Sequence, residues 1–207
     1  MTQDAHPVGY MEKILVADCE TSGMAFNSDD PSIDSVTGQT FQSVSWGFVV
    51  ADATTFQPIE KLYLEIQWDG VSKWEPKAQA VHGLALEYLE ANGMSEEDAV
   101  VAIASLILKY WGPDGSVSLG GHNVATFDLH FLRRLMRSQG IEIKFAHRHV
   151  DTSSIGLATF GTFTSDGLFE AVGIEARGKH NALDDAEHSL RAMRVVKQLF
   201  NACLEGA

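Results

Sequence analysis

The stretch Ile14-Leu15-Val16-Ala17-Asp18-Cys19-Glu20-Thr21-Ser22-Gly23 joins an apolar run to two acids and a turn sequence. It predicts a buried strand that ends in a turn. Because side chains alternate along a strand, Asp18 and Glu20 should point to one side and Cys19 to the other. Two neighbouring carboxylates resist joint ionisation, and a divalent metal ion would remove that conflict. Taken in isolation, however, an Asp-x-Glu sequence is more often a solvated pair at a strand end.

Two further strands are predicted downstream, over residues 44–50 and 62–66, with a turn near residues 52–54. With the first strand they should form an antiparallel meander. Residues 24–40 are rich in small and polar side chains and are predicted to form a long loop. This loop either folds beside the site and limits access to it, or is mobile surface.

The second half of the chain alternates helices and strands. A helix should begin after Ser95, which is followed by acids, and apolar residues recur at helical spacing as far as Trp111. Further elements are expected as a strand over 117–119, a helix from Asp128, a strand around Val150 and a last helix from about Ala182. This order predicts one α/β domain over residues 13–203 with a mixed sheet. Residues 1–12 are predicted to be a flexible N-terminal arm.

A second acidic position follows a predicted strand end in the segment 121–128. The strand end, turn and helix start place Asp128 at the edge of the parallel part of the sheet. The alternative is that Asp128 is only a helix-terminal acid that the helix dipole favours.

A third segment, 180–186, combines a histidine with acids at the start of the last helix. A histidine beside metal ligands can take a proton from an attacking water, which suits His180 and Asp185. A loop histidine without a partner would look the same in sequence. Asp184 lies on another side of the helix and is expected to be solvated. Three such segments in order, each at the edge of a sheet element, favour one shared site.

The composition is that of a folded protein, with 45% hydrophobic and 21% charged residues in a chain of 207. No apolar run could cross a bilayer, and the N-terminal residues do not resemble a secretory signal, so no membrane contact is expected. Cys19 and Cys203 lack metal-type spacing and indicate reduced thiols in a cytoplasmic protein. The net charge of −13 argues against a broad phosphate-binding groove. It agrees with an enzyme that holds phosphate through metals and contacts a short stretch of nucleic acid.

The segments together resemble a known family. Asp18-Cys19-Glu20-Thr21-Ser22-Gly23, His122-Asn123…Phe127-Asp128 and His180-Asn181-Ala182-Leu183-Asp184-Asp185-Ala186 are similar to the three motifs of the DEDDh (DnaQ-like) 3′→5′ exonucleases. Ala80-Val81-His82-Gly83-Leu84, Val150-Asp151-Thr152 and Gly167-Leu168-Phe169 are similar to intervening segments, the last to a helix start. The resemblance covers roughly residues 13–200.

The resemblance implies a ribonuclease-H-like fold with a five-stranded mixed sheet flanked by helices. It also implies two divalent metal ions, Mg²⁺ or Mn²⁺, about 4 Å apart, which stabilise the entering and leaving oxygens of an in-line displacement. The implied metal ligands are Asp18, Glu20, Asp128 and Asp185, with Asp18 bridging and Asp128 bound directly or through water. His180 would be the general base, and the product a nucleoside 5′-monophosphate.

By the same resemblance, the residues expected to contact substrate are Thr21, His82, Leu84, Asn123, Phe127 and Lys179. Thr21 would meet the terminal 3′-hydroxyl, and His82 and Leu84 would line the sugar and base pocket. Phe127 would stack or pack near the penultimate base. Arg177 and Lys179 would contact a phosphate. The alternative for His82 and Phe127 is core packing, and for the basic residues ordinary surface charge.

The expected partner is the 3′ end of a nucleic acid. The motif spelling favours single-stranded DNA, while short RNA stays open because a site for a 2′-hydroxyl is not readable from one sequence. We expect the chain to act without a fused polymerase, either alone or through a partner bound at its surface. A non-catalytic domain of the same fold is disfavoured because all five catalytic positions are filled.

Overall fold

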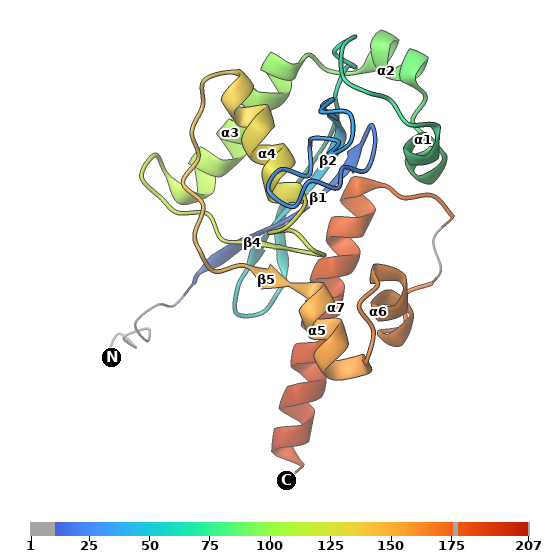
Figure 1. Ribbon diagram of the computed structural model, residues 1–207. Helices are drawn as coiled ribbons and strands as arrows, with labels where there is room; N and C mark the ends of the chain where they lie inside the picture. Colours follow the sequence, from blue (N-terminus) through green and yellow to red (C-terminus); the bar gives the residue numbers. More distant parts are fainter. Residues whose placement is uncertain (1–10, 176–177, 207) are drawn as a thin grey trace.

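The computed structural model describes residues 11–175 and 178–206 and shows a central sheet with helices on both faces (Figure 1). The predicted α/β class and the five-stranded mixed sheet flanked by helices are confirmed. Of the predicted N-terminal arm, only Met11 and Glu12 fall within the described residues, and the Glu12 carbonyl accepts a hydrogen bond from Ala53 N. Within the described ranges, no helix is long and apolar enough to span a membrane.

The strands lie in the order β3-β2-β1-β4-β5. Their bounds are β1 (Lys13–Thr21), β2 (Ser43–Asp52), β3 (Pro58–Glu65), β4 (Leu119–Gly121) and β5 (Val150–Asp151). The first three form the predicted antiparallel meander, whereas β4 and β5 run parallel to β1. The carboxyl ends of β1, β4 and β5 therefore meet at one edge of the sheet, where ligands bind in open α/β sheets.

The fourth strand is displaced from its predicted position. The prediction over residues 117–119 is wrong by two residues, because β4 starts at Leu119 and continues through two glycines. Val117 instead forms a separate bridge with Phe145. Glycines carry no side chain that signals a strand, yet the backbone of β1 leaves room only for a glycine at position 121. A Cβ at Gly121 would lie 2.5 Å from the Ala17 carbonyl oxygen.

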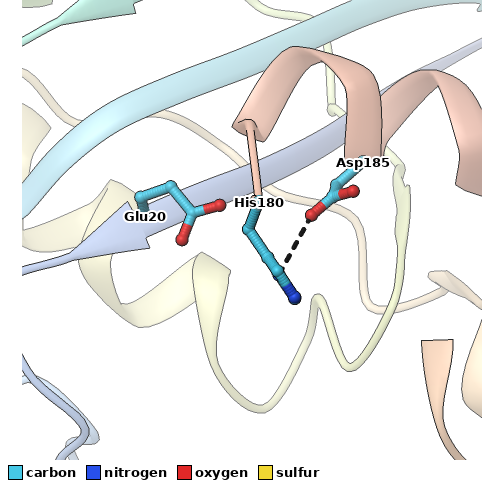
Figure 2. A group of neighbouring side chains, drawn as sticks. All are labelled: Glu20, His180 and Asp185. Carbon is cyan, nitrogen blue, oxygen red and sulfur yellow. Dashed lines mark ion pairs between the residues drawn. The ribbon is translucent and has the colours of Figure 1, made fainter. Parts of the chain in front are cut away.

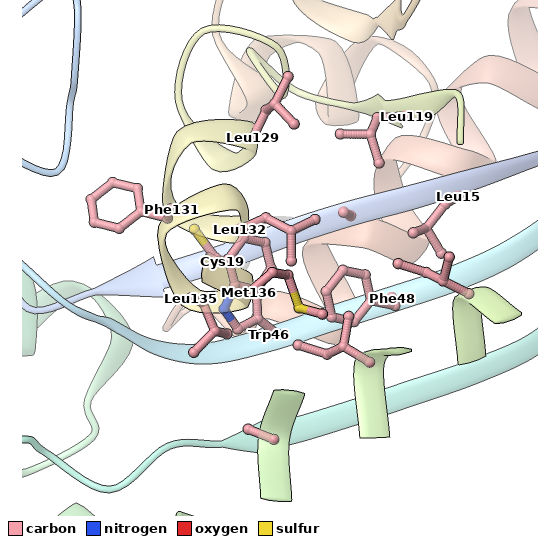
Figure 3. Close-up of a cluster of buried hydrophobic side chains, with 14 of the residues drawn as sticks. Leu15, Cys19, Trp46, Phe48, Leu119, Leu129, Phe131, Leu132, Leu135 and Met136 are labelled. Atoms are coloured by element: carbon pink, nitrogen blue, oxygen red, sulfur yellow. The ribbon is translucent and has the colours of Figure 1, made fainter. Parts of the chain in front are cut away.

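Alternate residues of β1 face two hydrophobic layers. Leu15, Ala17 and Cys19 pack in a cluster with α3 (Glu96–Trp111) and α4 (Asp128–Ser138), which Figure 3 shows with Trp46 and Phe48 of β2. Ile14 and Val16 pack against Ala186 and Leu190 of α7 (Ala182–Glu205) on the other face. Cys19 packs in the same cluster as Leu15 and Ala17, which agrees with the prediction that it points away from the side of Asp18 and Glu20. Asp18 and Glu20 continue the row of Ile14 and Val16, so the strand period directs both acids toward the side that α7 covers.

The three long helices begin where the sequence predicts. The Ser95 side chain caps α3 by accepting a hydrogen bond from Asp98 N, 3.1 Å away. The Asn181 side chain caps α7 by accepting from the backbone N of Leu183 and of Asp184. This cap defines where α7 begins, between His180 and Asp185.

Four shorter helices complete the described chain: α1 (Pro76–His82), α2 (Leu86–Asn92), α5 (Thr152–Phe160) and α6 (Ser165–Ala171). The sequence predicts only α6, through the resemblance at 167–169. The others are too short for helical periodicity to stand out. Their ends do carry signals, because Pro76 starts α1 and glycines with left-handed φ, Gly83 and Gly161, follow α1 and α5.

Candidate active site

A cleft opens at the carboxyl ends of β1 and β4 and encloses about 1410 Å³. This is more than the roughly 300–1,000 Å³ of a typical small-molecule pocket, so the cleft suits a longer ligand. All five residues predicted to form the active centre line it: Asp18, Glu20, Asp128, His180 and Asp185. They come from the end of β1, the start of α4 and the start of α7.

Asp128 is bound to the strand beside it. Its Oδ1 accepts a hydrogen bond of 2.8 Å from the backbone N of Cys19, which ties the first residue of α4 to β1. The side chain is buried, and burial raises the pKa of the Asp128 carboxyl, with the charge of Glu20 acting in the same direction. A purely helix-terminal acid would instead be expected to face solvent. The contact with β1 therefore favours Asp128 as a member of the active site over Asp128 as an acid that serves only the end of the helix.

Glu20, His180 and Asp185 form a group that could hold a metal ion. One ligand atom from each lies within 4.8 Å of the others, and Figure 2 shows the three side chains converging from β1 and the start of α7. Nδ1 of His180 lies 3.3 Å from Oδ2 of Asp185, so this histidine has a partner. Asp184 is exposed, as predicted, and Asp185 is buried.

The start of α7 is held close to the sheet. A Cβ on Gly47 of β2 would lie 2.2 Å from the Ala182 carbonyl oxygen and 2.3 Å from Leu183 Cα, so only glycine fits there. Gly47 is also the register partner of Asp18. The helix N-terminus and the acids of β1 are thus brought together by backbone packing, and the helix dipole favours carboxylates at that end.

The donor set fits hard divalent cations. Carboxylate oxygens are the ligands that Mg²⁺ and Mn²⁺ prefer, and the residues that line the cleft include the four predicted carboxylates together with His180. Among the described residues that line the cleft, Lys73 and Lys77 are the lysines or arginines, and Lys73 is paired with Asp34. The residues of this cleft can therefore hold a metal ion.

Four of the six predicted substrate-contacting residues line the cleft: Thr21, His82, Asn123 and Phe127. His82 is buried, and burial lowers the pKa of its imidazole to about 4, so it is neutral at neutral pH. Its Nδ1 accepts a hydrogen bond of 3.0 Å from Leu84 N. Phe127 also packs on Phe131, with ring centroids 5.0 Å apart. His82 and Phe127 therefore both pack against the protein interior and line the cleft.

The other two lie elsewhere. Leu84 and Lys179 are not among the residues that line the cleft. Leu84 follows Gly83, whose left-handed φ of 76° turns the chain at the end of α1. The exposed Lys179 side chain lies over Gly83. A Cβ added at Gly83 would lie 2.6 Å from the Nζ of Lys179. Arg177, predicted with Lys179 to contact a phosphate, lies outside the described residues.

No protein-family model and no curated protein matches the sequence. The structure, in contrast, matches solved exonucleases. E. coli exonuclease I in complex with a dT13 oligonucleotide gives a TM-score of 0.71 at 18% identity, covering 93% of this chain and 43% of that chain. The nuclease domain of 3′hExo, a DEDDh family member, bound to rAMP gives 0.67 at 14% identity, covering 94% and 95%. A full-length 3′-exonuclease gives 0.65 at 15% identity, covering 94% and 84%.

This chain has the ribonuclease-H-like fold of the DEDDh exonucleases. The structural match covers nearly all of the 3′hExo nuclease domain, whereas the chain spans only 41% of an exonuclease I chain. The expectation from the three sequence motifs is thereby confirmed for the fold.

Several residues that line the cleft are not predicted as site residues. Ser165 and Phe169 come from α6, and Ser189 lies one turn along α7 from Asp185. Spacing could have identified Ser189, because residues four apart on a helix share a face. The 24–40 loop also lines the cleft, so the alternative in which it folds beside the site is confirmed.

Proposed function

We propose that this protein is a metal-dependent 3′→5′ exonuclease that hydrolyses the last phosphodiester bond of a nucleic acid and releases a nucleoside 5′-monophosphate. The observation that carries the proposal is that the four predicted carboxylates and His180 line one cleft, in which ligand atoms of Glu20, His180 and Asp185 lie within 4.8 Å of one another. Fold likeness alone would not establish an activity, since one fold hosts many functions. The residue types in the cleft, their burial and their order along the chain are the further support for this activity.

Asp18, Glu20, Asp128 and Asp185 would hold two divalent ions, Mg²⁺ or Mn²⁺. When bound, such ions stabilise the negative charge on the entering and leaving oxygens of an in-line displacement. Burial raises the pKa of the Asp128 carboxyl, and a bound cation would stabilise its charged form.

His180 would act as the general base. Its Nδ1 faces Asp185, so the opposite nitrogen, Nε2, would accept the proton of the attacking water. The water oxygen bonds to phosphorus, and the bond from phosphorus to the 3′-oxygen of the penultimate nucleotide breaks. The upstream strand leaves with a 3′-hydroxyl after its oxygen is protonated. Asp185 would orient the ring and stabilise the imidazolium.

The proposed substrate is single-stranded DNA. Exonuclease I, which shares the fold, has been solved with a dT13 oligonucleotide. The net charge of −13 and the scarcity of lysine and arginine among the described cleft residues favour short contacts with the strand. Short RNA is the second candidate, favoured by the rAMP bound to the 3′hExo nuclease domain. A cytoplasmic location is proposed on the two free cysteines, Cys19 and Cys203.

The test is degradation of matched 5′-labelled single strands of DNA and RNA with Mg²⁺, with Mn²⁺ and with EDTA. Asp18→Ala and His180→Ala variants run beside the parent protein. We expect a ladder that shortens from the 3′ end, requires metal and disappears in both variants. The faster polymer identifies the substrate. If neither polymer shortens with either metal, the proposal is wrong, and a nucleotide-binding or scaffold domain of this fold becomes the better account.

A further inference from the structure

One wall of the cleft has no role in the proposed chemistry. It is formed by the segment between Met24 and Thr37, most of whose residues line the cleft. We call this segment the 24–37 wall. It belongs to the long connection between β1 and β2, so it starts directly after the acids of β1.

The 24–37 wall is held in a defined position. Within it, Asp34 Oδ1 accepts hydrogen bonds from Val36 N and Thr37 N at 2.8 and 3.1 Å. The Asp34 carboxylate also pairs with Lys73. At its start, Met24 N lies 3.3 Å from Glu75 Oε2. These contacts join the wall to residues that precede α1, so its side chains are presented to the cleft with little conformational freedom left to lose on binding.

The base of the wall is anchored by backbone contacts as well. Lys73 N donates to the Thr40 carbonyl at 2.9 Å, and Ser22 Oγ donates to the Lys73 carbonyl at 2.7 Å. Phe41 N donates to the Ser32 carbonyl at 2.7 Å. Replacing one exposed side chain on the wall should therefore leave its position unchanged.

Phe26 is the aromatic residue of this wall, and it lines the cleft while 75% of its surface stays exposed. Val36, on the same wall, is 91% exposed. The acids Glu20, Asp128 and Asp185 in the same cleft are all buried. The cleft thus combines buried acids with exposed apolar side chains on the 24–37 wall. Such side chains suit a ligand with flat groups beyond the reacting end, as nucleobases are.

We infer that Phe26 stacks on an unpaired nucleobase upstream of the terminal nucleotide and thereby favours single strands. This inference rests on the proposed exonuclease function. An aromatic ring stacks on any base, because every base has a π-face. In a duplex both faces of an internal base are already covered by its neighbours, so the ring gains a partner only when the strand is single.

The test separates binding from hydrolysis. Binding of a 5′-fluorescein oligothymidylate, single-stranded or annealed to oligoadenylate, is measured by anisotropy in EDTA. Hydrolysis with Mn²⁺ is measured on the same oligothymidylate and on thymidine 5′-(p-nitrophenyl phosphate), which has no upstream base. The variants are Phe26→Ala, Phe26→Trp and, as the matched control, Val71→Ala. Val71 is 88% exposed and is not among the cleft residues.

Phe26→Ala should raise Kd and KM for the single strand about tenfold, within the range measured for loss of one stacked base. It should leave unchanged the rate of hydrolysis of the p-nitrophenyl ester, the Kd for the duplex and the Tm of the protein. Phe26→Trp should restore single-strand binding, and Val71→Ala should match the parent.

Equal Kd and KM for parent and Phe26→Ala would overturn the inference, and so would an equal loss of single-strand and duplex binding. A drop in Tm together with slower ester hydrolysis would overturn it too, by assigning Phe26 a structural role. If the parent hydrolyses neither substrate, the exonuclease proposal fails, and the EDTA binding arm still decides on Phe26. If the parent does not bind the oligothymidylate in EDTA but hydrolyses it with Mn²⁺, the KM comparison decides on Phe26, and an unchanged KM overturns the inference.

Discussion

Nδ1 of His180 lies 3.3 Å from Oδ2 of Asp185, so the residue before the cap of α7 contacts a residue in the first turns of the same helix. Asn181 between them caps the helix. The histidine and the acid are therefore placed by one local structure. The third member of the group, Glu20, comes from β1.

The first prediction concerns His180 as general base. His180→Ala should lower kcat by about 10²- to 10⁴-fold and leave KM nearly unchanged, since a general base acts mainly in the transition state. Steady-state hydrolysis of a single-stranded oligonucleotide measures both constants. His147→Ala is the control, because His147 is exposed and is not among the cleft residues. A His180→Ala variant with unchanged kcat would remove His180 from the mechanism.

The second prediction separates two adjacent acids. Asp185→Asn should abolish the rise in Tm that Mn²⁺ gives the parent, because it removes a buried donor from the candidate metal group. Asp184→Asn should keep that rise, since Asp184 is exposed on another side of the helix. Thermal unfolding with and without Mn²⁺ measures the shift. Equal Mn²⁺ responses in both variants would contradict the assigned ligand.

The site was predictable from sequence where local rules place a side chain. Strand alternation predicts that Asp18 and Glu20 share a face, and the capped start of α7 accounts for His180 and Asp185. In each case a few neighbouring residues determine the geometry. Leu84 is not among the cleft residues, and its position depends on the left-handed turn at Gly83, which a motif match does not describe.

What sequence could not supply is long-range packing. The 24–37 wall has no periodicity, and its position depends on contacts with Lys73 and Glu75, which lie 39 and 51 residues downstream of their partners Asp34 and Met24. The strand β4 was hard to predict because its two glycines have no side chains and therefore give no strand pattern. They lie where neighbouring atoms pack too closely for a larger residue. The 24–37 wall lines the cleft, so the part of the site that we propose to contact the substrate was less visible in the sequence than the part that we propose to perform the chemistry.

The third prediction tests the packing of α7 on the sheet. Gly47→Ala should lower the free energy of unfolding by about 1–3 kcal/mol, because its Cβ would meet the backbone of Ala182 and Leu183. Activity should also fall in the folded protein, since relief of the clash moves the start of α7 and hence His180. Urea unfolding and kcat measure the two effects. Gly206→Ala is the control, since its Cβ would meet nothing nearer than 3.5 Å. A Gly47→Ala variant as stable as the parent would show that the start of α7 is not held against β2 at Gly47.

The last prediction follows from the buried acid Asp128. Because burial raises the pKa of its carboxyl, the native state holds this proton more tightly than the unfolded state does, whose pKa is about 3.9. Between the unfolded and the raised native pKa, the native state therefore binds more protons, and stability falls as pH rises through that window. In EDTA at pH above the window, Asp128→Asn should be more stable than the parent by about 0.5–2 kcal/mol, while losing activity with metal.

The amide keeps an oxygen that can accept from Cys19 N, so this hydrogen bond should persist in the variant. The stability difference should close as the pH falls below the unfolded pKa, where the parent carboxyl is protonated in both states. Urea unfolding of both proteins across this pH range in EDTA measures the difference. Added Mn²⁺ should stabilise the parent more than the variant, since only the parent keeps the full set of carboxylates. A variant less stable than the parent at every pH would show that the Asp128 carboxylate serves the fold rather than the site.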